Sequence, residues 1–285
     1  MSAEPAVLRL RILTSSRYEF PGEAEQVCLN EGTAAVGWPV DFVPQDWGAY
    51  YQRAIEIYGR RGANTVERLV QAESGTLVWL RDREGCYHLG ELHGSWQYDR
   101  GSRASRLDIA NCRPCRWLFT GSAMEVPGVV IRAFTGPGQA VRPIESDSVA
   151  RFSRALADGK GLASACTSED VIRDLLDDTD VEDLVALYLQ YIEGLIVVPP
   201  DRQRGHPGYD LEFVSPSGRR GVVQVKSGAA AYDLESLTSE AGEKWAFASS
   251  GVVTGEGTVI SVARLAAFLD EARDWLPKKL SRWFS

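Results

Sequence analysis

The chain has 285 residues, of which 44% are hydrophobic and 25% are charged, so it is long enough for two domains or for one large one. It contains no run of about 18 apolar residues and no basic-then-apolar N-terminus, so we expect neither a membrane-spanning helix nor a secretory signal. Five scattered cysteines favour a reducing cytoplasm over a disulfide framework. The net charge of −8 argues against tight non-specific binding of nucleic acid.

The first half of the chain predicts a small barrel-like β domain that also carries helices. Residues 7–14 alternate between apolar and polar side chains, which is typical of a strand, and residues 33–38 predict another. Helical signals follow over residues 46–73, with a glycine break and a capped restart at Asn64–Glu67. Short strands separated by glycine-containing turns then favour a barrel. We expect these strands at residues 75–82, 86–99, 112–121 and 128–136.

Three stretches of this half resemble the EVE- or PUA-like barrel domains. They are Gly37-Trp38, the run Gly75–Leu80 leading to His88–Glu91, and Trp96–Asp99 ahead of an arginine-rich segment. The resemblance covers residues 5–145 loosely and implies a nucleic-acid-binding domain, which can recognise a modified base flipped into an aromatic pocket. Trp38, Trp96 and Tyr98 each lie beside a glycine or a polar loop, so we expect them to stack on the base. The alternative is that these aromatic side chains fill the barrel core.

The segment from Arg100 to Arg116 is the strongest local concentration of positive charge. It carries Asp108 as its single acidic residue. Its arginines are Arg100, Arg103, Arg106, Arg113 and Arg116. Such a patch can contact phosphate although the whole chain is acidic, and we take Arg100, Arg103 and Arg106 as candidates for nucleic-acid binding.

Cys112 and Cys115 form a CxxC pair with two interpretations. The pair could be half of a zinc site that Cys86, His88 or His93 completes. The sequence has no second CxxC, and the strand-to-helix context of a redox CxxC is missing. Two ordinary thiols are therefore the simpler interpretation.

The second half predicts a separate α/β domain. A polar segment with Gly159 and Gly161 suits a linker, so we expect domains at residues 1–145 and 169–285 joined by residues 146–168. Helices are expected from Thr167 and, with a capping box, from Thr179–Glu182. The further elements are expected as a strand at 195–198, a hairpin, a helix at 233–243, strands at 244–249 and 258–262, and a helix at 263–275. This order favours a mixed sheet.

Residues 208–228 predict a β-hairpin around a Ser-Pro-Ser-Gly turn. Alternation along the first strand puts Asp210 and Glu212 on one face. The opposite face should carry Tyr209, Leu211 and Phe213. Gln224 and Lys226 share a face of the second strand, and Asp210 should lie level with Gln224. We therefore expect a carboxylate, an amide and an ammonium close together; the alternative is an ordinary amphipathic pair of strands with a surface ion pair.

This arrangement resembles the catalytic hairpin of the PD-(D/E)xK nucleases, in the Gln-x-Lys form of the Mrr-like restriction endonucleases. The resemblance implies that Asp210 and Gln224 hold Mg²⁺ or Mn²⁺ and that Lys226 positions the attacking water. It also implies a glutamate near the start of the preceding helix. Glu182 is the matching position, although a capping box explains Glu182 equally well.

The chain departs from that family in two ways. Tyr209 stands where the family has proline, and Gln224 supplies no negative charge. Glu212, on the same strand face as Asp210, is a second candidate for the missing charge. Arg204, in the loop before the hairpin, could contact a phosphate or simply lie in solvent.

These features predict a cytoplasmic, metal-dependent DNA endonuclease of restriction type. Its first domain, of a kind found fused to such nucleases, would direct it to modified or foreign DNA. We expect a homodimer, because two DNA strands need two active sites, and no membrane contact. Three alternatives stay open: a DNA-binding sensor that no longer cuts, an RNA-directed protein, and an effector switched on by a ligand or by a partner protein from a defence cluster.

Overall fold

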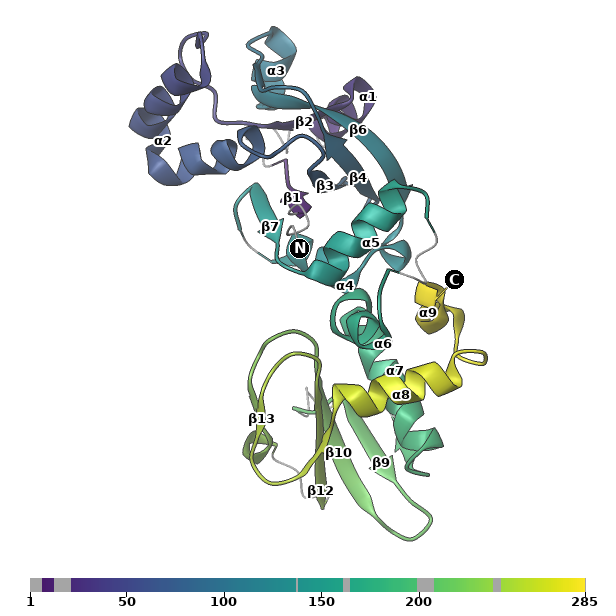
Figure 1. The fold of residues 1–285 in the computed structure, drawn as a ribbon. Helices are drawn as coiled ribbons and strands as arrows, with labels where there is room; N and C mark the ends of the chain where they lie inside the picture. The colour runs from purple at the N-terminus through teal and green to yellow at the C-terminus, as the bar shows by residue number, and fades with distance from the viewer. Residues whose placement is uncertain are drawn as a thin grey trace. The chain divides into compact units, whose positions relative to one another are not determined.

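The chain folds as two compact units, each with its own sheet and buried core (Figure 1). The structure, a computed structural model, describes residues 7–12, 22–136, 138–160, 165–198, 208–237 and 242–284. The first unit comprises residues 1–126 and 130–161, and the second comprises residues 127–129 and 162–285. The mixed α/β class expected from the sequence is confirmed.

The first unit is built on a curled, half-barrel sheet of order β2-β6-β4-β3-β1-β7, with β5 paired to β6. Its strands are β1 (Val7–Leu10), β2 (Thr33–Val36), β3 (Leu77–Arg81), β4 (Tyr87–Leu92), β5 (Gln97–Tyr98), β6 (Asn111–Gly121) and β7 (Val141–Ile144). The long strand β6 pairs with β2, β4 and β5. Its register with β4 shifts between Leu89 and Gly90, and such an irregularity helps a sheet to curl.

The helices of this region are α1 (Glu23–Glu31), α2 (Trp47–Val70), α3 (Ser102–Leu107), η1 (Ala123–Glu125), α4 (Gly128–Thr135) and α5 (Asp147–Ala157). Asp46 caps α2 by accepting a hydrogen bond from Ala49 N at 2.8 Å. The helix is interrupted at Gly59, three residues before the predicted glycine break, and the φ of 71° at Gly59 lies in the left-handed region that glycine tolerates. The capped restart predicted at residue 64 is wrong, because the Thr65 hydroxyl donates to Arg61 O within the helix at 3.0 Å.

The strand predicted at residues 128–136 is wrong, because this segment forms the helix α4. Its β-branched residues favour a strand by propensity alone. Val130 and Phe134 are nevertheless both buried, and their spacing of four places them on one face of a helix. Burial against the rest of the unit has therefore overridden local preference.

The linker predicted at residues 146–168 begins too early. Helix α5 lies within that range and belongs to the first unit. Phe152 and Ser153 are fully buried there, and the Ser153 hydroxyl accepts a hydrogen bond from Trp79 Nε1 at 3.0 Å. The division between the units falls after residue 161.

The second unit contains a five-stranded mixed sheet of order β14-β12-β10-β9-β8. Its strands are β8 (Ile196–Val198), β9 (Leu211–Val214), β10 (Arg220–Lys226), β12 (Glu243–Ala248) and β14 (Thr258–Ile260). Strands β8, β9 and β10 are antiparallel neighbours, whereas β10, β12 and β14 run parallel. The short strands β11 (Tyr232–Asp233) and β13 (Val253–Thr254) form a separate parallel pair.

The helices of the second unit are α6 (Ser168–Asp170), η3 (Val171–Leu175), α7 (Asp178–Tyr191), η5 (Leu234–Ser236), α8 (Val262–Ala272), α9 (Lys278–Ser281) and η6 (Arg282–Phe284). Figure 1 shows α7 and α8 beside the sheet. The helix predicted from Thr167 forms, and Thr167 opens it with a capping box that was not predicted. The box predicted at residues 179–182 is wrong, because α7 is capped by Asp177, which accepts from Asp180 N at 2.8 Å.

The two faces of this sheet have different cores. Phe213 and Trp245 pack on one face with ring centroids 5.7 Å apart. On the other face Val222 forms a cluster with Leu234 and Leu237. These two leucines lie where a helix was predicted over residues 233–243. That prediction is wrong for the described part, which is strand β11 followed by the 3-10 turn η5.

Candidate functional site

The predicted hairpin is formed by β9 and β10. Its turn closes through Gly218 N, which donates to Ser215 O at 2.9 Å. The register pairs Leu211 with Val223, and Asp210 N donates to Val223 O at 3.0 Å. Asp210 is thereby placed level with Gln224, as the alternation predicts.

The side chains of Asp210 and Gln224 are in direct contact. Asp210 Oδ2 accepts hydrogen bonds from Gln224 Nε2 and, at 2.7 Å, from Val225 N. Gln224 is only 3% exposed, so the contact is largely shielded from water. In this arrangement the amide nitrogen of Gln224, rather than its oxygen, faces the carboxylate.

Lys226 lies two residues beyond Gln224, on the same face of β10. Its side chain is half-buried, and Nζ is 5.6 Å from the centroid of the Tyr232 ring. Such a contact is a cation–π interaction. Among the ion pairs of the described residues, none joins Lys226 to Asp210. The structure therefore brings together two of the three predicted groups and places the third against an aromatic ring that the sequence did not single out.

Tyr209 does not follow the predicted alternation, whereas Glu212 does, because it is paired in register with Val222 on the face that carries Gln224. Asp210 lies in a bend before β9 begins, and Tyr209 packs against the cluster of Val222 instead of sharing a face with Leu211 and Phe213. Burial and the Glu212 carboxylate, to which Tyr209 is hydrogen-bonded, raise the pKa of Tyr209. The Glu212 carboxylate is therefore already hydrogen-bonded to Tyr209.

Glu182 lies in the second turn of α7, because the helix begins at Asp178. This position excludes the capping-box explanation. The first residue of the helix does lie near the hairpin, because Ser227 Oγ donates to Asp178 Oδ1 at 2.5 Å. Within the described parts of the chain, however, no three His, Cys, Asp or Glu side chains gather as a metal-binding group. Glu182, Asp210 and Glu212 thus do not form a carboxylate cluster.

The donor types at Asp210 and Gln224 fit a hard cation such as Mg²⁺. A carboxylate and an amide oxygen are ligands that Mg²⁺ accepts, with water completing the coordination. Asp210 retains its second carboxylate oxygen, since both hydrogen bonds described above go to Oδ2. Gln224 can offer its oxygen only if the amide group turns over, so the pair fits a cation after one side-chain rotation.

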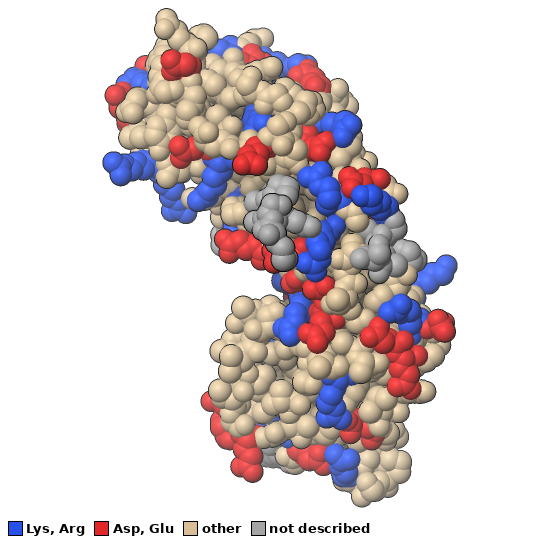
Figure 2. All heavy atoms as spheres, viewed as in Figure 1, with Lys and Arg blue, Asp and Glu red and all other residues tan. Residues whose placement is uncertain are grey.

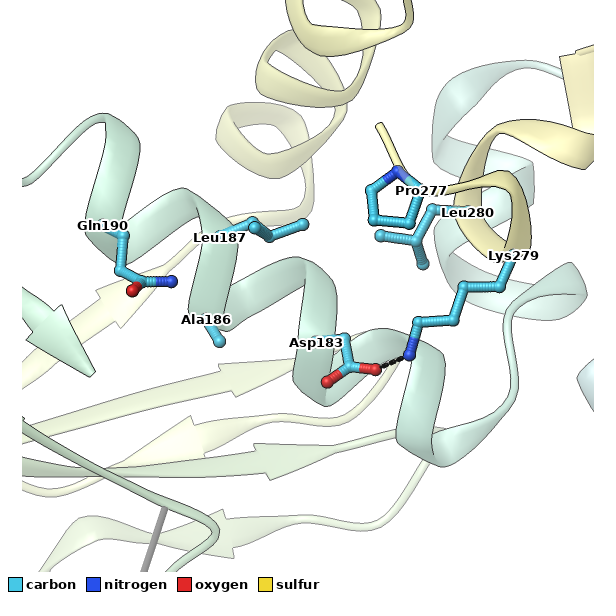
Figure 3. Close-up of a pocket in the computed structure, with 7 residues that line it drawn as sticks. All are labelled: Asp183, Ala186, Leu187, Gln190, Pro277, Lys279 and Leu280. Atoms are coloured by element: carbon cyan, nitrogen blue, oxygen red, sulfur yellow. Dashed lines mark hydrogen bonds and ion pairs between the residues drawn. The ribbon is translucent and has the colours of Figure 1, made fainter. Parts of the chain in front are cut away.

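A pocket of about 250 Å³ in the second unit lies away from these residues. It is formed by α7 and by the segment that contains α9, and Figure 3 shows Leu187 pointing toward Pro277 and Leu280. The ion pair between Asp183 and Lys279 closes one side. Neither Asp210 nor any other predicted site residue lines this pocket.

The aromatic candidates of the first unit surround the buried Asn111, a residue that sequence reasoning missed. Asn111 Nδ2 donates to Gly37 O at 2.6 Å and to Tyr50 Oη at 3.0 Å. Its Oδ1 accepts from Trp96 Nε1 at 3.2 Å. The Tyr98 hydroxyl accepts from Val40 N at 2.8 Å and lies 3.1 Å from Val40 O, to which it can donate. Sequence reasoning missed Asn111 because a single asparagine at the start of a strand belongs to no motif that predicts a buried hydrogen-bonding residue.

Trp38, Trp96 and Tyr98 all pack against the core of the first unit while remaining partly exposed. Trp38 has a φ of 62°, which is rare for a residue with a side chain and is often retained at functional sites. These three aromatic side chains therefore contribute to the core, as the alternative interpretation expects, while part of each stays exposed. Stacking on a nucleic-acid base stays a prediction.

The arginines of Arg100–Arg116 are mostly occupied. Arg103 pairs with Glu31, Arg106 with Glu23 at 2.5 Å, and Arg116 with Glu91 at 2.7 Å. Arg100 Nη1 donates to Asp41 O at 2.7 Å, and Arg113 is buried at 3% exposure. Figure 2 shows basic and acidic side chains interspersed on the face in view. This stretch is thus less positive than its sequence indicates. Arg204 lies outside the described residues.

Cys112 and Cys115 do not form a zinc site. Both lie on the strand β6, where residues three apart point to opposite faces, so their thiols cannot converge on one ion. Burial raises the pKa of Cys112 to about 11 and also raises that of Cys115. These thiols stay protonated at neutral pH, unlike the thiolates that bind zinc.

No protein-family model matches the chain, and no curated protein matches it in sequence. Within the described residues, no helix has both the length and the apolar character needed to cross a bilayer. The fold defines a two-unit α/β protein, with a half-barrel unit followed by a mixed-sheet unit. The candidate site of this chain is the acid–amide contact at the hairpin of its second unit.

Proposed function

We propose that this protein is a divalent-metal-dependent DNA endonuclease whose second unit cuts the phosphodiester backbone. The observation that carries the proposal is the shielded contact between Asp210 and Gln224, with Lys226 two residues further along the same strand face. Burying an amide against a carboxylate costs free energy that apolar packing would avoid. A role of the Asp210–Gln224 pair in binding a metal ion would explain why this unfavourable burial is present.

The proposed roles follow from the chemistry of each side chain. Bound Mg²⁺ or Mn²⁺ would polarise the phosphate and lower the pKa of a coordinated water. Asp210 supplies the negative charge for the cation, and Gln224 supplies a neutral oxygen ligand. Lys226 orients the attacking water and offsets charge that develops on the phosphate; its flexible stem allows the ammonium to leave the Tyr232 ring.

The first unit would direct the nuclease to modified or foreign DNA through the partly exposed Trp38, Trp96 and Tyr98. The described cysteines are all free, which supports action in the reducing cytoplasm. The edge strand β8 exposes Ile196 (52%) and Val198 (41%). Exposed apolar edges promote pairing between chains, which supports a homodimer.

A DNA-binding sensor that does not cut is the second candidate. It is favoured by the absence, within the described residues, of a group of three potential acid, histidine or cysteine ligands. It is also favoured by the contact of Lys226 with Tyr232 rather than with Asp210. On this alternative the Asp210–Gln224 pair only fastens β9 to β10.

Plasmid nicking with Mg²⁺ or Mn²⁺ separates the two candidates. Lys226→Ala should lower the rate at least about a hundredfold, because a group that orients water and stabilises charge contributes on that scale. Lys244→Ala is the matched control: Lys244 is paired in register with Val222 on the neighbouring strand, so it occupies the same sheet face without the proposed role. We expect the control to nick at the wild-type rate.

Equal nicking by wild type and Lys226→Ala would remove the proposed mechanism. Binding of DNA by wild type without any nicking, on unmodified and on base-modified plasmids, would favour the sensor. Competition between labelled DNA and RNA distinguishes a third outcome, in which the first unit selects RNA.

A further inference from the structure

Four arginines lie on one face of the neighbouring strands β7, β1 and β3, and we name this group the arginine face. The register places Arg9 directly opposite Arg142. Arg11 follows Arg9 by two residues and so shares its face. The pairing of β1 with β3 ends at Leu10 and Leu80, so the next residues along the two strands are Arg11 and Arg81. Segments far apart in the sequence thus assemble this cluster.

The cluster lacks the acidic partners that neutralise other arginines of this unit. No ion pair within the described part of the chain involves Arg9, Arg11, Arg81 or Arg142, whereas three arginines of the 100–116 stretch are paired with glutamates. The positive charges act on one another instead. Burial, followed by repulsion from Arg11 and Arg142, lowers the pKa of Arg9 to about 10. At neutral pH the Arg9 guanidinium therefore stays charged.

The end of α4 accounts for part of this arrangement. Arg9 Nη1 donates to Ala133 O at 2.7 Å, and Arg11 Nη2 donates to Phe134 O. Cations near the last carbonyls of a helix are favourable. Arg9 also donates to Gln139 O, so backbone carbonyls hold the two inner arginines in place.

Helix capping leaves three observations unexplained. Arg9 is 1% exposed, and its Nε is buried without a hydrogen-bond partner, which is rare and costly. Arg81 and Arg142 are exposed and take no part in capping α4. Arg142 stands directly opposite Arg9 in the sheet, and like charges at such positions are destabilising. A bound anion would relieve this repulsion.

We propose that the arginine face binds a phosphate group and that this phosphate belongs to a DNA backbone. Guanidinium groups present several N–H donors in a planar fork that matches phosphate oxygens. Arg9 is buried and contributes only its charge, the partly exposed Arg11 forms the floor, and the exposed Arg81 and Arg142 lie on either side of the ligand. The assignment to DNA rests on the proposed function, whereas the phosphate site itself does not.

The test is binding of a short fluorescent DNA duplex in EDTA, so that cleavage plays no part. The double variant Arg81→Gln/Arg142→Gln should bind about tenfold more weakly, and the slope of log affinity against log salt should fall by about 0.9, because one phosphate contact is lost. The matched control is Arg53→Gln/Arg273→Gln, which removes two exposed arginines already paired with Asp41 and Asp270. We expect the control to keep the wild-type slope.

A second probe, inorganic pyrophosphate measured by calorimetry, distinguishes the source of the phosphate. Binding of both probes by wild type, each weakened in the double variant, supports the proposal. Binding of pyrophosphate alone supports the phosphate site and overturns its assignment to DNA. Unchanged binding of both probes by the double variant, or no binding by wild type, overturns the site. Because EDTA removes divalent metal, a failed nicking assay bears on the nuclease proposal and leaves this result unaffected.

Discussion

At the scale of single residues, buried polar groups carry much of the specificity of this protein. Asn111 is fully buried and satisfies a backbone carbonyl, a tyrosine hydroxyl and a tryptophan N–H at once. A buried polar group that loses its partner pays its full desolvation cost. The aromatic side chains around Asn111 are therefore positioned by hydrogen bonds as well as by packing.

Replacing Asn111 by leucine should destabilise the first unit strongly. The substitution leaves Gly37 O, the Tyr50 hydroxyl and Trp96 Nε1 without their partner, so we expect a loss of about 3 kcal/mol in the free energy of unfolding, from urea denaturation. Gln97→Leu is the control, because Gln97 is exposed on the adjoining strand β5. Equal stability of the two variants would contradict the central role of Asn111.

At the scale of elements, β10 and β12 are tied together at their start by an ion pair. Arg219, in the turn before β10, donates to both carboxylate oxygens of Glu243 at 2.8 and 2.9 Å. Glu243 opens β12, where it is paired with Gly221. The Arg219 guanidinium lowers the pKa of Glu243 to about 2. A bidentate contact of this kind favours the parallel pairing of two strands that are distant in sequence.

This ion pair predicts a pH-dependent stability for the second unit. The pKa of Glu243 is lower in the folded state than its usual value of 4.5, so the stabilisation is fully present above about pH 4.5 and is lost as pH falls toward 2. Because both side chains are more than a third exposed, solvent screening limits the effect to about 1 kcal/mol or less.

Urea unfolding at about pH 6 and about pH 3 measures this effect. Between these conditions wild type should lose more stability than Glu243→Gln, which carries no titrating carboxyl at this position. If the variant loses as much stability as wild type, Glu243 does not contribute to the acid sensitivity.

At the scale of the whole molecule, the chain is two units with separate cores. The end of the first unit is set by α5 rather than by β7, because α5 buries Phe152 and supplies the Ser153 hydroxyl to Trp79. Polar and glycine residues after α5 resemble a linker in composition, but burial decides which segment belongs to which core.

A fragment of residues 1–161 should fold, and a fragment of residues 1–145 should not fold stably. Removing α5 strips Phe152 from the core, which by itself costs about 3–5 kcal/mol. Circular dichroism during heating compares the two fragments. Phe152→Ala in the longer fragment is the control that isolates the packing contribution, and a cooperative, equally stable 1–145 fragment would show that α5 is dispensable.

The sequence alone determined the features that depend on neighbouring residues. Alternation and a Ser-Pro-Ser-Gly turn predict the β9–β10 hairpin, and they place Asp210 level with Gln224. The mixed α/β class and the two-part organisation follow in the same way from periodicity and composition. These patterns suffice because strand register and helix faces are set within a few residues.

Only the tertiary structure decided what depends on partners far along the chain. It turned residues 128–135 into the helix α4, placed Lys226 over Tyr232, neutralised the predicted basic stretch and gathered unpaired arginines on β7, β1 and β3. The physical reason is that burial and charge pairing depend on which surfaces come into contact after folding. A local sequence pattern does not specify those contacts.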